Sequence, residues 1–489
     1  MRLTSLDQIP AALRPGYTPA QHGTGIVHLG TGAFHKAHQA AVTDAALAAS
    51  GGDWRITGVS LRSPDAARAL NPQNGLYTLI ERGAGRTHAR VIGAIAHVIE
   101  GANNPAQVLK ALTAPTTKIV SLTVTEKAYG LIRATRTCDP DHPAVAADLA
   151  NPDTPQGVLG LITRALTLRQ QAKLPPFTVL CCDNLPDNGA LLRGATLDFA
   201  RRLNPALADY IAETVAFPAT MVDRITPAAS AETYAEALRQ TGCTDLAAIE
   251  TEPFLQWVIE YHFPQSRPNW EAGGAVFVTD VAPYEAMKLR MLNGTHSMLA
   301  YAGFLAGHAY VRDTTADPAL ARLIQRHFQA AAATLPPLSG LDTTAYAAAL
   351  TERFANPAIA HQTYQIAMDG TEKLPQRLFS AATDALHLKQ PLRPFAFATA
   401  AWMRYTLGRH DTGEPYALRD PREAEIAARL AGLTGASDIA ATLMTLPNFL
   451  PAVLAQSAEW QSETTDCLTA MLTHGVVAAI LAESRVPCA

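Results

Sequence analysis

The hydrophobic pattern of the first half of the chain alternates short apolar runs with helical stretches. Four runs rich in β-branched residues have the length of buried strands: Gly25–Leu29, Arg55–Leu61, Thr117–Thr123 and Thr178–Cys182. Between the second and third runs the pattern predicts further β structure and then a helix: Leu76–Ile80, Arg90–Ile99 and Pro105–Leu112. Strands that alternate with helices are typical of a parallel sheet with crossover helices. The first half therefore predicts an α/β domain.

The pattern changes near Asp280–Pro283, where long Ala- and Leu-rich helical periods begin and strand-like runs nearly vanish. A chain of 489 residues is also longer than one compact core usually holds. We therefore expect two domains, a sheet domain over residues 1–282 and a mostly α-helical domain over residues 283–489.

Charge and composition exclude several classes of partner. The formal net charge of −4 leaves no basic footprint for nucleic acid. No apolar run is long enough to cross a bilayer, and the opening MRLTSLDQIPAALRP lacks the layout of a signal peptide. We expect a cytoplasmic protein with no nucleic-acid or membrane partner; the oligomeric state is not indicated.

The cysteine and histidine spacings argue against a metal site. The six cysteines show no C-x-x-C pair, so neither a thiolate metal site nor a disulfide framework is predicted. His35 and His38 form an H-x-x-H pair, but no cluster of carboxylates or thiolates stands beside them. We predict no metal, so that any proton transfer falls to a side chain.

A glycine-rich turn follows the first predicted strand. Ile26–His38 reads IVHLGTGAFHKAH, in which Gly30 and Gly32 join an apolar strand to a helical run. Glycine lets the backbone approach a pyrophosphate closely, and the helix N-terminus then faces the phosphate. The third glycine of the usual fingerprint is replaced by His35, and an ordinary βα turn gives a similar pattern. The position at the first strand of an α/β series favours dinucleotide binding.

The end of the second predicted strand bears on the choice of dinucleotide. NAD enzymes commonly place an acidic residue there for the ribose 2′-hydroxyl, whereas a nearby arginine suits the 2′-phosphate of NADP. This chain places Arg62 and Ser63 first and Asp65 later. Arg62 is thus a candidate cofactor residue or simply a solvated loop residue. NAD is the expected cofactor, and NADP is not excluded.

The segment Tyr284–His308 predicts a helix that carries reactive side chains. At about 100° per residue, Lys288, His296 and Asn293 share one arc with three leucines. Three methionines line the other side, so the helix is expected to be buried. Burial disfavours the charged form of a lysine and prepares Lys288 to exchange protons near neutrality.

The other two polar groups of this arc complete a catalytic hypothesis. Asn293 can donate a hydrogen bond to an oxyanion, and His296 can orient a hydroxyl group. The alternatives are a Lys288 that extends to solvent and a His296 that is a satisfied core residue. Three such groups on one buried face favour the catalytic interpretation.

The K-x-x-x-x-N-x-x-H spacing of Lys288, Asn293 and His296 resembles the signature of the mannitol dehydrogenase family. Further blocks resemble the family in family order from about Ile26 to Arg404: IVHLGTGAFHKAHQA, SLTVTEKAYG, CCDNLPDNG, FPATMVDRITPA, EPFLQWVIE and IAMDGTEKLPQR. The resemblance implies an N-terminal Rossmann-type domain followed by an α-helical C-terminal domain. It also implies a zinc-independent, NAD(P)-dependent oxidoreductase that acts on a sugar acid or polyol.

The resemblance also assigns roles to single residues. Lys288 resembles the general acid/base, with Asn293 and Asn184 as oxyanion-stabilising amides. The positions that resemble substrate contacts are His296, Asp223 and Lys373. Gly30, Gly32 and Phe34 resemble the cofactor turn, and Glu126, at the end of a central strand, is expected to face the nicotinamide or the proton path of Lys288. Two purely structural alternatives stay open. Asn184 can stabilise only the turn in which it lies, and Asp223 can act only as the ion-pair partner of Arg224.

Within the family, the blocks HQTYQIAMDGTEKLPQR, SLTVTEKAYG and KLRMLNGTHS look closest to fructuronate reductases, which interconvert D-fructuronate and D-mannonate. Such a substrate carries a carboxylate, for which Lys373 and Arg377 are candidates, with a surface position as the equal alternative for Arg377. Mannitol-active members tend to carry an arginine before the DG-x-x-KLP block, where this chain reads YQIAMDG. Mannitol 2-dehydrogenase or another polyol dehydrogenase is the alternative. A decarboxylating hydroxyacid dehydrogenase and a catalytically silent nucleotide-binding protein are more distant ones.

Overall fold

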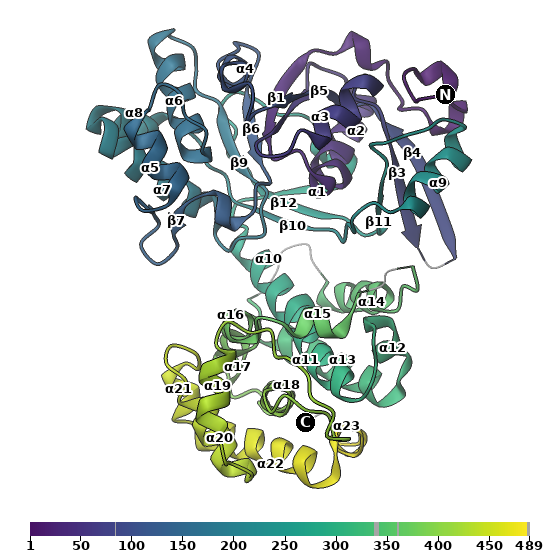
Figure 1. Ribbon diagram of the computed structural model, residues 1–489, viewed down its shortest axis with the longest axis vertical. Helices are drawn as coiled ribbons and strands as arrows, with labels where there is room; N and C mark the ends of the chain where they lie inside the picture. Colours follow the sequence, from purple (N-terminus) through teal and green to yellow (C-terminus); the bar gives the residue numbers. More distant parts are fainter. Residues whose placement is uncertain (84, 337–341, 359–360, 487–489) are drawn as a thin grey trace. The chain divides into compact units, whose positions relative to one another are not determined.

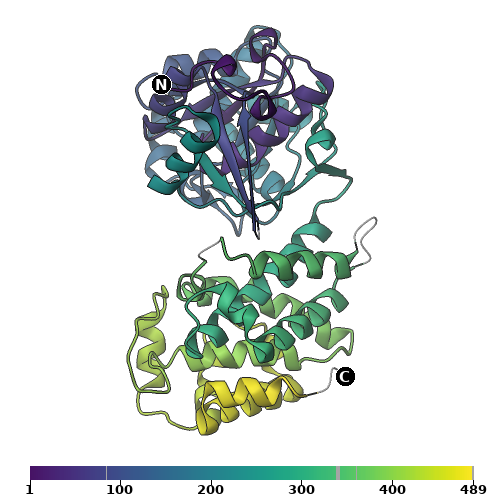
Figure 2. The ribbon, with the colours of Figure 1, turned by 90° about the vertical axis from the view of Figure 1, so that its right-hand side faces the viewer.

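The computed structural model describes residues 1–83, 85–336, 342–358 and 361–486. The chain divides into two compact units, Met1–Ala282 and Pro283–Ala489, and each is described here by itself (Figure 1). The first unit carries all the named strands of the described residues, and the second is built from helices and loops (Figure 2).

A five-stranded parallel sheet forms the centre of the first unit. Its strands stand in the order β5 (Ile95–Glu100), β2 (Arg55–Ser60), β1 (Thr24–Leu29), β6 (Ile119–Leu122) and β9 (Thr178–Cys181). All four neighbouring pairs are parallel, and the central strands are buried. Four of the five strands were predicted from their apolar runs, so the predicted α/β class is confirmed. The strand order reverses at β1, and doubly wound sheets bind dinucleotides at such a reversal.

The β structure between β2 and β6 differs from its prediction. The run Arg90–Ile99 is two strands, because the chain breaks at Gly93 between β4 (Arg86–Ile92) and β5. β4 pairs antiparallel with β3 (Tyr77–Gly83), and β3 pairs in parallel with β11 (Ile249–Thr251). β5 instead joins the central sheet beside β2. One apolar run therefore serves two different sheets.

The first unit contains two further small sheets and nine α-helices among its described residues. One sheet has the order β10 (Thr220–Asp223), β12 (Gln256–Glu260) and β13 (Ala275–Val278), and the other is the pair β7 (Leu131–Ile132) and β8 (Thr137–Cys138). The helices are α1 (Ala33–Ala37), α2 (Gln39–Ser50), α3 (Asp65–Leu70), α4 (Pro105–Leu112), α5 (Pro143–Ala150), α6 (Val158–Gln171), α7 (Asn188–Leu203), α8 (Pro205–Thr214) and α9 (Ala231–Thr241).

The second unit is helical, as predicted. Its α-helices are α10 (Ala282–Met287), α11 (Thr295–Leu305), α12 (Val311–Ala316), α13 (Pro318–Ala333), α14 (Thr343–Phe354), α15 (Thr363–Ala367), α16 (Gly370–Leu374), α17 (Ser380–His387), α18 (Arg393–Tyr405), α19 (Glu423–Leu430), α20 (Ala436–Met444), α21 (Ala452–Ala455), α22 (Ala458–His474) and α23 (Val476–Glu483). α18 is buried from Phe395 to Tyr405 and packs against α11 and α22. Two π-helical segments, Lys288–Gly294 and Pro375–Phe379, follow α10 and α16 directly. The centre of this unit is therefore the apolar packing around α18.

Candidate active site

The glycine turn after β1 is shaped by its two glycines in different ways. Gly30 has φ of +97°, and a Cβ there would meet the backbone carbonyl of Thr123. A side chain at this position is therefore excluded both by conformation and by space. Gly32 has ordinary φ and precedes α1 as its N-cap, and the nearest atom to a Cβ there would be 3.7 Å away. Gly32 thus leaves open space at a helix N-terminus, where a pyrophosphate fits.

A chain of hydrogen bonds holds the carbonyl side of this turn. Thr123 Oγ1 donates to the Gly30 carbonyl oxygen at 3.1 Å, so its oxygen is left to accept from His28 Nε2 at 2.8 Å. His28 Nδ1 then accepts from Ser121 Oγ at 2.8 Å. Because His28 lies on β1, Ser121 lies on β6 and Thr123 directly follows β6, these hydrogen bonds connect the turn to two neighbouring strands.

His35, which replaces the third glycine of the usual fingerprint, stacks on His28. The two fully buried rings have centroids 3.4 Å apart and lie within 14° of parallel. Burial lowers the pKa of His35 to about 3 and holds the pKa of His28 well below its usual range. Both rings are neutral at pH 7, so they stack without charge repulsion. Phe34 makes a second stack in this helix, with His38 at 5.0 Å.

Helix α1 is fixed at its C-terminal end by the buried Arg224, which follows β10. Arg224 Nη1 donates to the Ala37 carbonyl oxygen at 2.6 Å, and Nη2 forms an ion pair with Glu81 at 2.5 Å. The carboxylate partner of Arg224 is thus Glu81, and the alternative in which Asp223 serves only Arg224 does not hold. Asp223 itself is buried at the end of β10.

Asp183 connects the loops after β6 and β9. Its carboxylate accepts from the backbone N–H groups of Val124 at 2.9 Å and Thr125 at 3.0 Å, and from the Tyr129 hydroxyl at 2.6 Å. Thr125 has φ of 71° and ψ of 150°, a strained conformation for a β-branched residue. Backbone strain of this kind costs of order 1–3 kcal/mol and clusters at functional sites. Asp183 is therefore the group that holds this loop in place.

Two predicted residues lie in these loops. Glu126 begins a short 3-10 helix beyond β6 rather than ending the strand, and it is exposed and paired with Arg133 at 2.5 Å. Asn184 is exposed in the loop after β9. The neighbouring Asn188 instead serves the fold, because its amide bonds both the N–H and the C=O of Thr220. The roles of Glu126 and Asn184 stay predictions.

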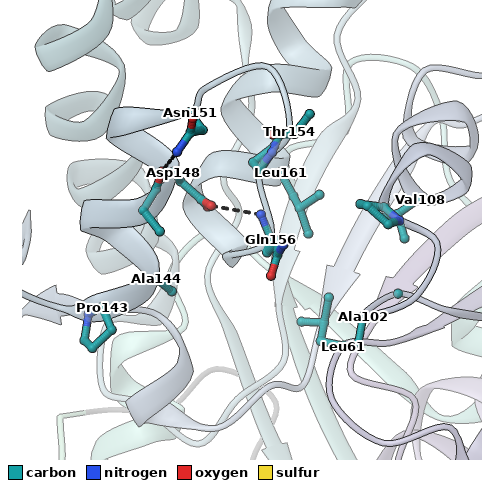
Figure 3. Close-up of a pocket in the computed structure, with 14 residues that line it drawn as sticks. Leu61, Ala102, Val108, Pro143, Ala144, Asp148, Asn151, Thr154, Gln156 and Leu161 are labelled. Atoms are coloured by element: carbon teal, nitrogen blue, oxygen red, sulfur yellow. Dashed lines mark hydrogen bonds between the residues drawn. The ribbon is translucent and has the colours of Figure 1, made fainter.

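A cavity of about 450 Å³ lies beside the ends of β2 and β5 (Figure 3). Leu61, Ala102 and Val108 line one side, and Asp148 is on the other, where it accepts from the backbone N–H groups of Gln156 at 2.9 Å and Gly157 at 2.8 Å. Arg62 directly follows Leu61 and is exposed. This is the sheet edge at which the adenosine of a dinucleotide lies in doubly wound folds.

In the second unit, Lys288 and Asn293 belong to a π-helical segment, which corrects the α-helical projection. An α-helix joins residues four apart through its backbone hydrogen bonds, whereas a π-helix joins residues five apart. Lys288 and Asn293 are five positions apart, so the segment Lys288–Gly294 stacks them along one side instead of spreading them around the arc. His296 follows three positions later in α11. Lys288 and His296 are only 7% and 8% exposed.

The second π-helical segment, Pro375–Phe379, packs directly against the first. A Cβ at Gly294 would lie 2.7 Å from the Arg377 carbonyl oxygen, so glycine permits the close approach of the two backbones. Arg377 Nη1 also reaches Ser297 Oγ at 3.4 Å. Among the described residues, Arg377 has no carboxylate within ion-pair distance. The predicted Arg377 therefore lies next to the Lys288 helix.

Lys373 makes its contacts within its own turn. Its Nζ donates to the Met368 carbonyl oxygen at 2.6 Å and lies 3.4 Å from the Asp369 carboxylate. Burial lowers the pKa of Lys373, the Arg377 charge lowers it further, and Asp369 opposes both effects. These contacts organise the turn, and the role of Lys373 in substrate binding stays a prediction.

His296 lies among aromatic and basic side chains. Its ring packs on Phe354 at 4.4 Å and meets the edge of His361 at 5.3 Å. Burial, together with the nearby His361, Arg353 and Arg377, holds the pKa of His296 well below its usual range. His296 is therefore a neutral group at pH 7, able both to donate and to accept a hydrogen bond.

Sequence reasoning missed three features of these sites. The π-helical segment leaves no periodic signal in so short a window, although the five-residue spacing of Lys288 and Asn293 is consistent with it. Asp183 is part of the quoted block CCDNLPDNG, but the backbone N–H groups that it binds follow a different strand, so the sequence does not reveal the contact. His361 was likewise part of a quoted block, and only the fold brings it to His296.

No group of three or more potential ligand side chains is placed to bind a metal ion within the described ranges. Over the same ranges, no helix combines the length and apolar character that a membrane crossing needs.

Models of known families match most of the chain. The mannitol dehydrogenase Rossmann domain matches residues 24–272, and the mannitol dehydrogenase C-terminal domain matches residues 280–471. The D-mannonate oxidoreductase of Escherichia coli (strain K12) is 42% identical over 480 residues, covering 96% of this chain and 98% of that protein.

Two solved structures are similar over the whole chain. The ternary complex of Pseudomonas fluorescens mannitol 2-dehydrogenase with NAD and D-mannitol matches with a TM-score of 0.84 at 35% identity, covering 100% of both chains. A substrate-free D-sorbitol dehydrogenase matches with a TM-score of 0.92 at 34% identity, covering 98% of this chain and 100% of that one.

Proposed function

Because the chain belongs to the mannitol dehydrogenase family, we propose that it is an NAD-dependent oxidoreductase that interconverts D-fructuronate and D-mannonate. The observation that carries the reaction class is the π-helical segment, which stacks a buried lysine and an amide on one side of a helix. The choice of substrate is supported by the similarity to the E. coli D-mannonate oxidoreductase, which this chain matches at 42% identity over nearly its full length.

The glycine turn fits NAD. The positive φ of Gly30 and the open space at Gly32 leave room for a pyrophosphate at the start of α1. When bound, NAD accepts a hydride from the alcohol carbon or, in its reduced form, returns one to the carbonyl. Exposed Arg62 follows β2, while Asp65 accepts a hydrogen bond from Ser63 at 2.5 Å. Arg62 therefore keeps NADP as an alternative cofactor.

The side chains of the Lys288 helix supply the proton chemistry. Lys288 takes the proton of the substrate hydroxyl during oxidation and returns it during reduction. Asn293 donates a hydrogen bond to the oxygen as negative charge develops on it. His296, neutral at pH 7, orients a second hydroxyl group of the substrate. Asn184 is proposed as the second amide donor and Asp223 as a further substrate contact.

Arg377 favours an acidic substrate over a neutral polyol. Its side chain is half-buried, contacts Ser297 Oγ and has no carboxylate within ion-pair distance among the described residues, and burial lowers its pKa. A half-buried guanidinium with no opposite charge at ion-pair distance is costly, and a substrate carboxylate offsets that cost through charge-assisted hydrogen bonds.

The direct test compares kcat/KM for D-fructuronate and D-fructose with NADH at one pH and salt concentration. A charge-assisted hydrogen bond contributes roughly 1.5–3 kcal/mol, so we expect D-fructuronate to be preferred by about 10–100-fold. Equal or better turnover of D-fructose would replace this proposal by mannitol 2-dehydrogenase, the activity named for the P. fluorescens structure. Lys373→Met is expected to narrow the preference if Lys373 binds the carboxylate. An equal loss on both substrates would mean a role in the turn alone.

The absence of a required metal gives a second prediction. The proton transfer assigned to Lys288 needs no metal ion, so dialysis against a strong chelator is expected to leave kcat unchanged. The activity is measured before and after dialysis, and again after adding Zn²⁺. A loss that only Zn²⁺ restores would contradict the assignment.

A further inference from the structure

The peptide group between Gly30 and Thr31, in the glycine turn after β1, is held from both sides. Its carbonyl oxygen accepts a hydrogen bond from Thr123 Oγ1 at 3.1 Å, and its N–H donates to the Val59 carbonyl oxygen at 3.2 Å. The N–H of Gly30 donates to the same Val59 oxygen at 2.9 Å. A glycine leaves its neighbouring peptide groups free to rotate, because it has no Cβ. Hydrogen bonds from β2 and from the end of β6 therefore set the orientation of this turn.

The buried ring of His28 decides where the hydroxyl hydrogen of Thr123 points. Burial holds the pKa of His28 well below its usual range, so the ring is neutral at pH 7 and carries one N–H. Thr123 gives its single hydroxyl hydrogen to the Gly30 carbonyl oxygen, and its own oxygen accepts from His28 Nε2 at 2.8 Å. His28 Nδ1 then accepts from Ser121 Oγ at 2.8 Å. This arrangement of hydrogens satisfies all three contacts and directs the Thr123 hydroxyl to the turn.

Thr123 and His28 are themselves fixed by their surroundings. The N–H of Thr123 donates to the Leu29 carbonyl oxygen at 3.0 Å, and the carbonyl group of Thr123 occupies the space in which a Cβ of residue 30 would lie. The ring of His28 is covered by His35 of α1, with ring centroids 3.4 Å apart. The three contacts of the previous paragraph thus connect β1, β6 and the first helix around a single turn.

We propose that Thr123 is a positioning residue for the dinucleotide, because its hydroxyl holds the Gly30–Thr31 peptide group in the orientation in which the turn receives the pyrophosphate. The inference rests on the proposed function, since it takes the glycine turn as the NAD site. A turn that is ordered before binding loses less conformational freedom when the cofactor binds. Without the Thr123 hydroxyl, the peptide group keeps only its contact with β2, and NADH binds more weakly.

The experiment measures the dissociation constant of NADH by fluorescence titration of the full chain, together with thermal unfolding, in three variants. Thr123→Val keeps the shape of the side chain and removes the hydroxyl, whereas Thr123→Ser keeps the hydroxyl. The matched control is Thr117→Val at the other end of β6, where Thr117 Oγ1 donates to the Ala111 carbonyl oxygen at 2.8 Å.

For Thr123→Val we expect the dissociation constant to rise by about 3–10-fold, the effect of one lost hydrogen bond. Thr123→Ser is expected to stay within about 2-fold of wild type, because the donor is kept. Thr117→Val also loses a hydroxyl that binds a backbone carbonyl group, so thermal stability is expected to fall in both valine variants. In the control, however, the dissociation constant of NADH should be unchanged.

An unchanged dissociation constant in Thr123→Val, an equal rise in Thr117→Val, or a Thr123→Ser variant as weak as Thr123→Val would each overturn the positioning role. If Thr123→Val folds poorly, Thr123→Ala and Thr123→Ser decide, because they differ only in the hydroxyl. Tighter binding by the serine variant supports the proposal, and equal binding contradicts it. The titration uses no sugar substrate, so these outcomes leave the proposed reaction in place. A wild-type chain that binds neither NADH nor NADPH would instead overturn the proposed function itself.

Discussion

Replacing Lys288 by alanine is expected to lower kcat by about 10²–10⁴-fold while NAD still binds. Lys288 is 7% exposed and is the first residue of the π-helical segment that also contains Asn293. Alanine therefore removes the proposed proton acceptor, and the residues of the glycine turn, which belong to the other unit, are unchanged. Steady-state oxidation of D-mannonate gives kcat, and fluorescence titration with NADH gives the dissociation constant of the cofactor.

The matched control is Lys110→Ala, which truncates an exposed lysine on α4. It is expected to change neither kcat nor the dissociation constant of NADH. A Lys288→Ala enzyme with near-normal kcat would contradict the general acid/base role. An enzyme with normal kcat at saturation but a raised KM would show that Lys288 only binds substrate.

The fold was predictable where a local pattern and the final packing agree. The strands β1, β2, β6 and β9 are short runs rich in β-branched residues, each buried in a parallel sheet, and strands buried in this way are mostly apolar. The run Arg90–Ile99 was predicted as one stretch of β structure because it is equally apolar on both sides of Gly93. Its two parts are separate strands that pair with different strands, β4 with β3 and β5 with β2. Strand pairing is a long-range property that an apolar run does not carry.

The candidate site was predictable in its residue types and only partly in its geometry. The sequence pattern placed Lys288, Asn293 and His296 on one face, but it assumed a uniform α-helix. The π-helical segment packs against Pro375–Phe379, which lies far along the chain, so a local pattern does not reveal this contact. The contacts of Asp183 with the loop after β6, and of His361 with His296, arise in the same way from segments distant in sequence.

Gly294 tests whether the packing of the two π-helical segments sets the reactive geometry. Its φ is −64°, so alanine is compatible with the backbone and would by itself favour a helix by roughly 1 kcal/mol over glycine. The new Cβ, however, would lie 2.7 Å from the Arg377 carbonyl oxygen and 3.1 Å from His327 Cε1. The two segments must then move apart, because a backbone carbonyl cannot turn aside as a flexible side chain can.

We therefore expect Gly294→Ala to lower kcat by about 10²-fold, since a displacement of about 1 Å can cost that much when catalytic groups must be aligned. The dissociation constant of NADH should be unchanged, because the glycine turn lies in the other unit. The control is Gly435→Ala, where φ is −80° and the nearest atom to a Cβ is the movable Asp438 carboxylate at 3.3 Å. Steady-state kinetics and thermal unfolding of both variants distinguish a loss of catalytic alignment from a loss of stability. A Gly294→Ala enzyme of normal kcat would show that Lys288 and Asn293 keep their alignment without this contact.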